Sequence, residues 1–368
     1  MYNNLSNEQK LIILLGRLTF SSENVKEITE LVENNTVNWF DFAKYALYHR
    51  TFTLSFYNLY KISKQYINKI PKYLNSLYSY SYNGIKTMNK LYEIELQEIL
   101  SQANSRKITI IPVKGLYLIK NLYNDYGIRY SGDLDILIGR HNVNELEPVL
   151  ADCGFIQAKY DYETNEYIKI PRSEKIKWKL NMSNILPYIK KSNSELDKFY
   201  KIDLRFALDD RLDTIPVNEM IDLYQKNGFL NPECYLMHLC THFYGEAKYS
   251  GTILFGKDLN IIKLCDIREF IVANGGRKIL SDAIKFAKKH SLEHALYYTI
   301  HILKQVYNDG YESNVLDEIE FDDLSILNTY GESTLTDIHK FKKGFWERFF
   351  SCNNSDELLS TPKMFEKI

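Results

Sequence analysis

Two short apolar segments, separated by an amphipathic one, constrain the fold of this chain more than any other feature. Residues 108–113 (Ile-Thr-Ile-Ile-Pro-Val) form an apolar run of the length that is typical of a buried strand. The run ends at Lys114-Gly115, and the segment from Leu116 to Tyr123 has the spacing of a short helix. Residues 133–138 then predict a second buried strand, which opens with two acids. We therefore expect two core strands joined through a helix.

The two acids of the second run, Asp133 and Asp135, are two residues apart. Residues i and i+2 of a strand point to the same face, so the two carboxylates would lie side by side with Leu134 on the other face. Neighbouring carboxylates repel each other, and a divalent cation between them removes that repulsion. Oxygen ligands of this kind suit Mg²⁺, which usually also binds substrate phosphates. Gly132 has no side chain and would let a phosphate approach the backbone.

This arrangement resembles the nucleotidyltransferase superfamily typified by DNA polymerase beta, and within it a group of bacterial "nucleotidyltransferase family" proteins. Their shared pattern is Lys-Gly, a helix, an Arg, and then Gly-Asp-x-Asp on an apolar strand. The resemblance covers roughly residues 38–270, and these residues carry it: Lys114, Gly115, Tyr123, Arg129, Gly132, Asp133 and Asp135. It implies a mixed α+β fold in which helices flank a polymerase-beta-like core with a mixed sheet.

The resemblance also implies a third acid on a later strand. Residues 199–208 alternate between apolar and polar positions, which predicts a strand, and Asp203 followed by Leu204 fits the family's acid-Leu pattern. Arg205 stands where the family often has His, and the histidines that often precede Leu-Pro in relatives are missing before Leu186-Pro187. We therefore expect the acceptor to differ from that of such relatives. The alternative for Asp203 is an exposed ion pair with Arg205.

The activity implied is transfer of a nucleoside monophosphate from a nucleoside triphosphate, with ATP as the default, to a hydroxyl of a small-molecule or protein acceptor. Asp133, Asp135 and Asp203 would bind two Mg²⁺ ions, with Mn²⁺ as a substitute, and pyrophosphate would be released. The residues expected to contact the nucleotide are Lys114, Gly115, Arg129, Ser131, Gly132 and Lys263. Other hypotheses are a catalytically inactive or antitoxin-like binding protein on the same fold, and a metal-dependent phosphohydrolase.

Several of these residues have a second interpretation. Arg129 would either reach a phosphate or brace the acid loop. Lys263 would either reach the triphosphate or form a surface pair with Asp266, three residues later on a predicted helix. His238 and His242 lie one helical turn apart, a spacing that can bind a metal, although histidines that line the cleft or pack between helices are the more common case.

The chain divides by its patterns into three regions. Residues 1–104 predict helices, among them one over 39–66 that contains His49-Arg50, a pair that recurs in the family, and one over 74–103 that Gly84 would interrupt. Residues 105–215 predict the α/β core, in which the alternation over 175–182 indicates a strand. Residues 216–368 predict a helical domain.

Composition restricts the partners and the compartment. The formal net charge is −1, so no overall attraction draws the chain to nucleic acid, and we expect no nucleic-acid partner. The five cysteines are scattered and form no CxxC pair, which fits a reducing cytoplasm. The sequence predicts no signal peptide and no membrane span. It gives no indication of the oligomeric state.

Overall fold

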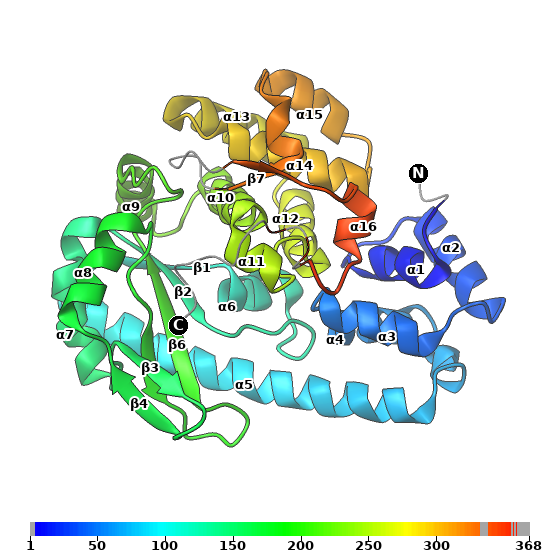
Figure 1. Cartoon of the computed structure of the whole chain (residues 1–368), viewed down its shortest axis with the longest axis horizontal. Helices are drawn as coiled ribbons and strands as arrows, with labels where there is room; N and C mark the ends of the chain where they lie inside the picture. Colours follow the sequence, from blue (N-terminus) through cyan, green and yellow to red (C-terminus); the bar gives the residue numbers. More distant parts are fainter. Residues whose placement is uncertain (1–3, 332–337, 355, 357, 359–368) are drawn as a thin grey trace.

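The computed structural model describes residues 4–331, 338–354, 356 and 358. The end of the expected C-terminal helical domain, residues 359–368, lies outside the described residues. Figure 1 shows the main sheet at the left and the N-terminal helices at the right, with the long helix α5 running below from one to the other. The helices that follow the sheet in sequence lie above. The fold is therefore mixed α+β, as the sequence predicts.

The first part of the chain is helical. Ser6 and Ser21 cap the first two helices, each accepting a hydrogen bond from the backbone N–H three residues later. The elements are α1 (Asn7–Leu15), α2 (Ser22–Glu33), α3 (Trp39–Tyr48), α4 (Phe52–Ile62), the 3-10 helix η1 (Lys64–Asn68) and α5 (Lys72–Ser105). The expected interruption of α5 at Gly84 is wrong, because the helix continues through that residue.

The predicted helix over residues 39–66 is also wrong, because the chain breaks it into α3 and α4. Arg50 adopts a left-handed conformation with φ 58°, and the Thr51 N–H donates to the Ala46 carbonyl at 2.8 Å. This is the closing bond of a helix C-terminus that usually requires glycine. His49 is buried at the junction and packs against the rings of Phe349 and Phe350. Because of this break, the Arg50 side chain does not point where a continuous helix would place it.

The main sheet has four strands in the order β1-β2-β6-β5. Their bounds are β1 (Ile110–Val113), β2 (Leu134–Ile138), β5 (Tyr188–Lys191) and β6 (Phe199–Arg205). β2 runs antiparallel to β1 and parallel to β6, while β5 runs antiparallel to β6, so the sheet is mixed as expected. The strands predicted over 108–113, 133–138 and 199–208 are confirmed to within a few residues.

Shorter elements connect these strands. They are α6 (Gly115–Leu118), the π-helix η2 (Ile119–Tyr123), the 3-10 helix η3 (Arg140–Asn142), α7 (Val143–Asp152), the hairpin of β3 (Ala158–Asp161) and β4 (Glu166–Lys169), and α8 (Arg172–Asn181). One apolar core joins α5 and α7 to the sheet, and a second joins the N-terminal helices to those that follow the sheet. The sheet therefore lies between α5 and α7 and the C-terminal helices.

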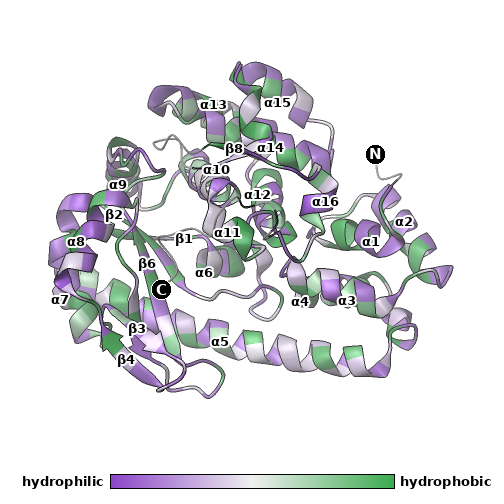
Figure 2. Ribbon diagram, viewed as in Figure 1, coloured by the Kyte–Doolittle hydropathy of each residue, from purple (hydrophilic) through white to green (hydrophobic). Residues whose placement is uncertain are grey.

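The strand predicted over 175–182 is wrong, because this segment is the helix α8. None of its residues is buried, and Figure 2 colours it largely hydrophilic. Alternation predicts a strand only where one face packs against a core. Here Ile176 is 49 % exposed and Leu180 is 63 % exposed. The high helix propensity of Lys, Leu and Arg then decides the local conformation.

The part of the chain after β6 is helical apart from one short strand pair. Its elements are α9 (Ile215–Asn227), α10 (Pro232–Lys248), α11 (Ser250–Leu254), α12 (Ile261–Ala273), α13 (Arg277–His290), α14 (Glu293–Val306), α15 (Glu312–Ile319), the 3-10 helix η4 (Leu324–Leu327), β7 (Thr329–Tyr330), β8 (His339–Lys340) and α16 (Phe345–Phe349). Among the described residues, no helix is both long and apolar enough to cross a membrane.

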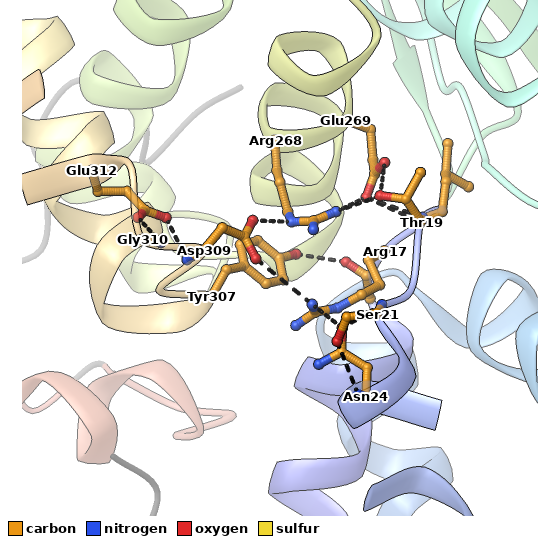
Figure 3. Close-up of polar contacts among 12 residues, drawn as sticks. Arg17, Thr19, Ser21, Asn24, Arg268, Glu269, Tyr307, Asp309, Gly310 and Glu312 are labelled. Carbon is orange, nitrogen blue, oxygen red and sulfur yellow. Dashed lines mark hydrogen bonds and ion pairs between the residues drawn. The ribbon is translucent and has the colours of Figure 1, made fainter. Parts of the chain in front are cut away.

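A buried polar cluster attaches the N-terminal helices to α12 and the end of α14 (Figure 3). Arg268 of α12 donates to Thr19 at 3.0 Å and to Asp309 at 2.5 Å. The Thr19 hydroxyl in turn donates to Glu269 at 3.0 Å, and Tyr307 donates to the Gly16 carbonyl at 2.6 Å. Because buried charges are stable only when paired, this cluster fixes α12 against the first helices. The position of α12 matters because it forms one wall of the candidate site.

Candidate active site

One cavity of about 470 Å³, hereafter the main cavity, lies where the sheet meets α10 and α12. All the site residues expected from the sequence line it: Lys114, Gly115, Arg129, Ser131, Gly132, Asp133, Asp135, Asp203 and Lys263. They come from segments up to 149 positions apart in the chain. The structure therefore brings this set together around one space.

The three acids lie at neighbouring positions of the sheet. Asp135 on β2 pairs in register with Asp203 on the parallel strand β6, and Asp133 directly precedes β2. The Asp135 side chain is 8 % exposed and that of Asp133 is 35 % exposed. Lys201 of β6 places its Nζ 3.7 Å from Asp133 Oδ2. Asp135 is thus the buried member of the set, and Asp133 lies at the mouth.

Lys114 connects the acids to α10. Its Nζ lies 2.6 Å from Asp135 Oδ1 and 2.6 Å from His242 Nε2. Burial raises the pKa of Asp135, and the Lys114 charge opposes that shift. Burial also disfavours the charged form of Lys114, but Asp135 and Asp133 outweigh it and raise the Lys114 pKa. Lys114 has φ 53°, a strained value for a residue with a side chain, of the kind found at functional sites.

His242 continues this chain of polar contacts toward α12. Its Nδ1 lies 3.2 Å from Glu246 Oε2, and Lys263 Nζ lies 2.5 Å from the same oxygen. Burial lowers the pKa of His242 to about 4, so the neutral ring accepts from Lys114 and donates to Glu246. His238, one turn earlier, is buried away from this contact. His242 is therefore a cleft-lining histidine, one of the two interpretations that the sequence left open.

Gly115 is required by its neighbour Ser131. A Cβ at Gly115 would lie 2.2 Å from the Ser131 hydroxyl, far inside contact distance. The Ser131 hydroxyl donates to the Asp133 carbonyl at 3.0 Å, and the Ser131 backbone N–H donates to Asn89 Oδ1 at 3.2 Å. The Lys-Gly turn and the acid loop therefore fit against each other through a serine.

Arg129 forms an ion pair with α12, an arrangement that agrees with the bracing role, one of its two sequence interpretations. It donates to both carboxylate oxygens of Asp266 on α12, at 2.9 Å from Nε and 2.6 Å from Nη2. The Tyr123 hydroxyl donates to the same carboxylate at 2.6 Å. Asp266 is therefore engaged by Arg129 and Tyr123, while Lys263 binds Glu246, in place of the surface pair considered between Lys263 and Asp266.

Asp203 is held by a side chain that the sequence did not single out. Asn184 Nδ2 donates to Asp203 Oδ1 at 2.7 Å, and Asn184 Oδ1 accepts from the Trp178 ring at 3.1 Å. Burial opposes ionisation of Asp203, but the charges of Arg205 and Lys114 outweigh it and lower the Asp203 pKa. Arg205 donates to Ser183 at 3.3 Å and acts on Asp203 through its charge.

Basic side chains outnumber acidic ones around the main cavity, seven to five. Four of the seven, Arg50, Lys201, Arg205 and Lys257, were not among the expected site residues. Burial lowers the pKa of Lys257, and the charges of Arg50 and Lys201 lower it further. These cations come from three distant segments of the chain. The concentration of positive charge at the cavity therefore becomes apparent only in the folded structure. A polyanion such as a triphosphate would relieve their mutual repulsion.

The donor set fits a divalent cation in its chemistry. The three carboxylates face one cavity, and Mg²⁺ typically takes one or two carboxylates together with substrate phosphates. In the described part of the chain, no three acidic, histidine or cysteine side chains converge tightly enough to hold a metal ion by themselves. The Lys114 ammonium provides the positive charge beside Asp135. Lys114 contacts Asp135 Oδ1, so a metal ion that bound this same oxygen would compete with Lys114 for it.

Comparison with known protein families identifies a family for this chain. A family described as "Uncharacterised nucleotidyltransferase" matches residues 35–308, well over half of the chain and all of the residues that line the main cavity. No curated protein and no solved structure shows a significant match.

Proposed function

Because the chain belongs to this nucleotidyltransferase family, it is a transferase of phosphorus-containing groups, and we propose that it moves AMP from ATP to a hydroxyl of a small-molecule or protein acceptor in an Mg²⁺-dependent reaction. One observation carries the proposal. Asp135 and Asp203 face each other on parallel strands, beside Asp133, at a cavity rich in basic side chains. Nucleotidyl transfer needs carboxylates that bind a metal ion and, next to them, basic side chains that bind the phosphates.

The basic wall is assigned to the triphosphate. Arg50, Lys257 and Lys263 line the side of the cavity formed by the α3–α4 junction and the start of α12. Each could neutralise phosphate oxygens, and Arg50 has the planar fork that binds two of them at once. Ser131 and Gly132, which directly precede Asp133 in the chain, also line the cavity. The α-phosphate would then face the acids, and the β- and γ-phosphates would face the basic wall.

The acids have separate tasks in this mechanism. Asp133 and Asp135 would hold Mg²⁺, with Mn²⁺ as a substitute and Asp203 as the third ligand, and the bound ion would polarise the α-phosphate and the acceptor hydroxyl. Asp203 Oδ2, the oxygen not bonded to Asn184, accepts the hydroxyl proton. The hydroxyl oxygen forms a bond to the α-phosphorus, the bond from that phosphorus to the bridging oxygen breaks, and pyrophosphate leaves. Lys114 supports the negative charge that develops there.

The acceptor is proposed to be a small molecule or a protein side chain. The formal net charge of −1 gives no general attraction for a long nucleic acid. An alternative function has one observation in its favour, the Lys114–Asp135 contact of 2.6 Å. Because it already neutralises the carboxylate, the same fold could bind a nucleotide or a partner without performing transfer.

The test combines nucleotide binding with product release. We would measure thermal stabilisation by each of the four nucleoside triphosphates, with and without Mg²⁺, for the wild type, for Asp133→Asn/Asp135→Asn, and for Asp222→Asn, an exposed residue of α9, as the control. A ligand at about a hundred times its Kd adds roughly 2.7 kcal/mol of stability. We expect an Mg²⁺-dependent shift with ATP that only the double variant loses.

The outcomes separate the two functions. Pyrophosphate release from ATP by the wild type and the control, absent in the double variant, supports transfer. Equal stabilisation of wild type and double variant with no pyrophosphate supports the binding protein. Stabilisation by none of the four nucleotides would contradict both transfer and nucleotide binding, and would favour the partner-binding form of the alternative.

A further inference from the structure

A second cavity of about 220 Å³, hereafter the side cavity, adjoins the main cavity. Arg205, His242 and Glu246 line both spaces, so the two share a boundary. The side cavity is lined by residues of the end of β6, the loop after α8, and α10 with α11, and none of the three acids Asp133, Asp135 and Asp203 lines it. Whatever occupies the side cavity is therefore next to whatever reacts in the main one.

Gly245 leaves part of the side cavity open. It lies inside α10, where a glycine is less stable than alanine by about 1 kcal/mol. A Cβ at Gly245 would meet no atom of the chain within 4 Å. This differs from Gly115, whose missing side chain makes room for Ser131. At Gly245, the space created by the missing side chain is part of the cavity itself.

The walls of the side cavity are mostly apolar and aromatic. Met182, Leu208, Tyr244 and Tyr249 supply these surfaces, and Arg205 supplies a charge at the boundary. The other charged residues that line the space are Asp209, Asp210, Glu246 and Lys248. Pockets with such walls and a few polar groups bind the apolar body of a small ligand and orient its polar end. The volume is less than half that of the main cavity, and the basic wall is elsewhere. The side cavity is thus unsuited to a second triphosphate.

We propose that the side cavity binds the body of the acceptor, a small alcohol or phenol with an apolar or aromatic frame. Asp203 and Arg205 are two residues apart on β6, so their side chains lie on one face at a spacing of about 7 Å. A hydroxyl that passes Arg205 therefore reaches Asp203. The inference rests on the proposed function: the acceptor O–H loses its proton to Asp203, its oxygen bonds to the α-phosphorus of ATP, and pyrophosphate leaves.

The experiment fills the side cavity and measures small-molecule binding by saturation-transfer NMR. The probes are phenol, benzyl alcohol, 2-phenylethanol and cyclohexanol, each added with Mg²⁺ and α,β-methylene-ATP, which blocks nucleotidyl transfer. The proteins are wild type, Gly245→Ala, Gly245→Leu and Gly84→Leu. Gly84 is the matched control, because it is also inside a helix and a Cβ there would meet nothing within 4 Å.

We expect at least one probe to bind the wild type and Gly84→Leu while the nucleotide analogue is bound. Gly245→Leu should weaken that binding by about tenfold or more, and Gly245→Ala should weaken it less, because a larger side chain fills more of the cavity. Absence of probe binding to the wild type overturns the inference, as does equal binding to Gly245→Leu. Thermal stabilisation by the analogue is recorded for every variant as a check of the fold and of the main cavity.

The two proposals fail in different ways. If the analogue stabilises the wild type but the probes do not bind, the acceptor inference is wrong and the proposed function stands. If the analogue stabilises none of the proteins, the proposed function is wrong and the inference falls with it.

Discussion

Arg129 and Asp266 form a buried, two-pronged ion pair between the acid loop and α12, with N···O distances of 2.9 and 2.6 Å. The same helix carries Lys263. This one pair therefore fixes the position of Lys263 relative to the acids of the main cavity. Burial opposes the charge of Arg129, and Asp266 outweighs it and raises the Arg129 pKa. The guanidinium therefore depends on Asp266 as its partner.

We predict that Asp266→Ala destabilises the protein by about 3–5 kcal/mol, because it leaves a buried charge unpaired. Urea denaturation measures the change. The control is Asp282→Ala, which removes an exposed pair with Lys285 and should change the free energy of unfolding by less than about 1 kcal/mol. Equal, small effects of both changes would show that Arg129 finds another partner or water.

Asn184 is predicted to be a positioning residue for Asp203. Asn184→Leu removes the 2.7 Å hydrogen bond to the carboxylate, and hydrogen bonds to charged groups contribute about 1.5–3 kcal/mol. Because this bond helps to lower the Asp203 pKa, its loss should raise that pKa and move the acid limb of the rate–pH profile to higher pH. We expect kcat for pyrophosphate release to fall roughly tenfold or more at neutral pH.

A merely structural role for Asn184 would leave the profile in place. The matched control is Asn144→Leu on α7, an exposed residue whose side chain binds only Lys179 at 3.2 Å among the described contacts. Stabilisation by ATP should survive in both variants. A fall in kcat without movement of the acid limb would contradict the assigned role.

Arg50 and Lys257 are predicted to bind the triphosphate. Arg50→Ala and Lys257→Ala should each weaken ATP by about tenfold and AMP much less, because AMP lacks the β- and γ-phosphates. Calorimetry with ATP and AMP at two salt concentrations measures both effects, and the ATP deficit should shrink at high salt. Lys26→Ala, a change at an exposed residue of α2, is the control. Equal weakening of ATP and AMP would place these cations away from the terminal phosphates.

The part of the site that the sequence predicts is local. Asp133 and Asp135 belong to an apolar strand whose period of two is readable from the sequence, and Asp203 lies on another such strand. Their nearness follows once β2 and β6 pair. The Lys114-Gly115 turn follows from the motif, although the reason for Gly115, its contact with Ser131, needs the structure.

The part that the sequence does not predict depends on tertiary contacts. Arg50 reaches the main cavity because the helix ends at a left-handed residue that is not glycine, for which the local sequence has no signal. Lys257 enters from a loop whose place depends on α12. Glu246 lies four residues after His242, a spacing that marks a shared helix face, but only the fold shows that Lys263 meets it. The strand wrongly predicted over the residues of α8 also reflects tertiary contacts. An alternating pattern specifies a strand only where one of its faces packs against a core, and here neither face does.

His49 is predicted to make stability fall in mild acid. Its ring is buried between the α3–α4 junction and α16, and burial lowers its pKa from the ordinary 6.5 to about 3. Between these values the unfolded chain binds a proton at His49 and the folded chain does not. Stability is therefore fully present above pH 6.5 and is lost as pH falls, by about 1.4 kcal/mol per pH unit for this one group.

We expect His49→Gln to be less stable than the wild type at pH 7 and to lose less stability on acidification. From pH 7 to pH 5 the wild type should lose about 2 kcal/mol more than the variant, in urea denaturation at both values. His141→Gln, a change at an exposed residue of η3, is the control and should keep the wild-type dependence. All other ionisable groups are the same in both proteins, so the difference reports His49 alone. Parallel pH dependences for wild type and His49→Gln would mean that the folded protein admits the proton, and that the junction before Arg50 opens in acid.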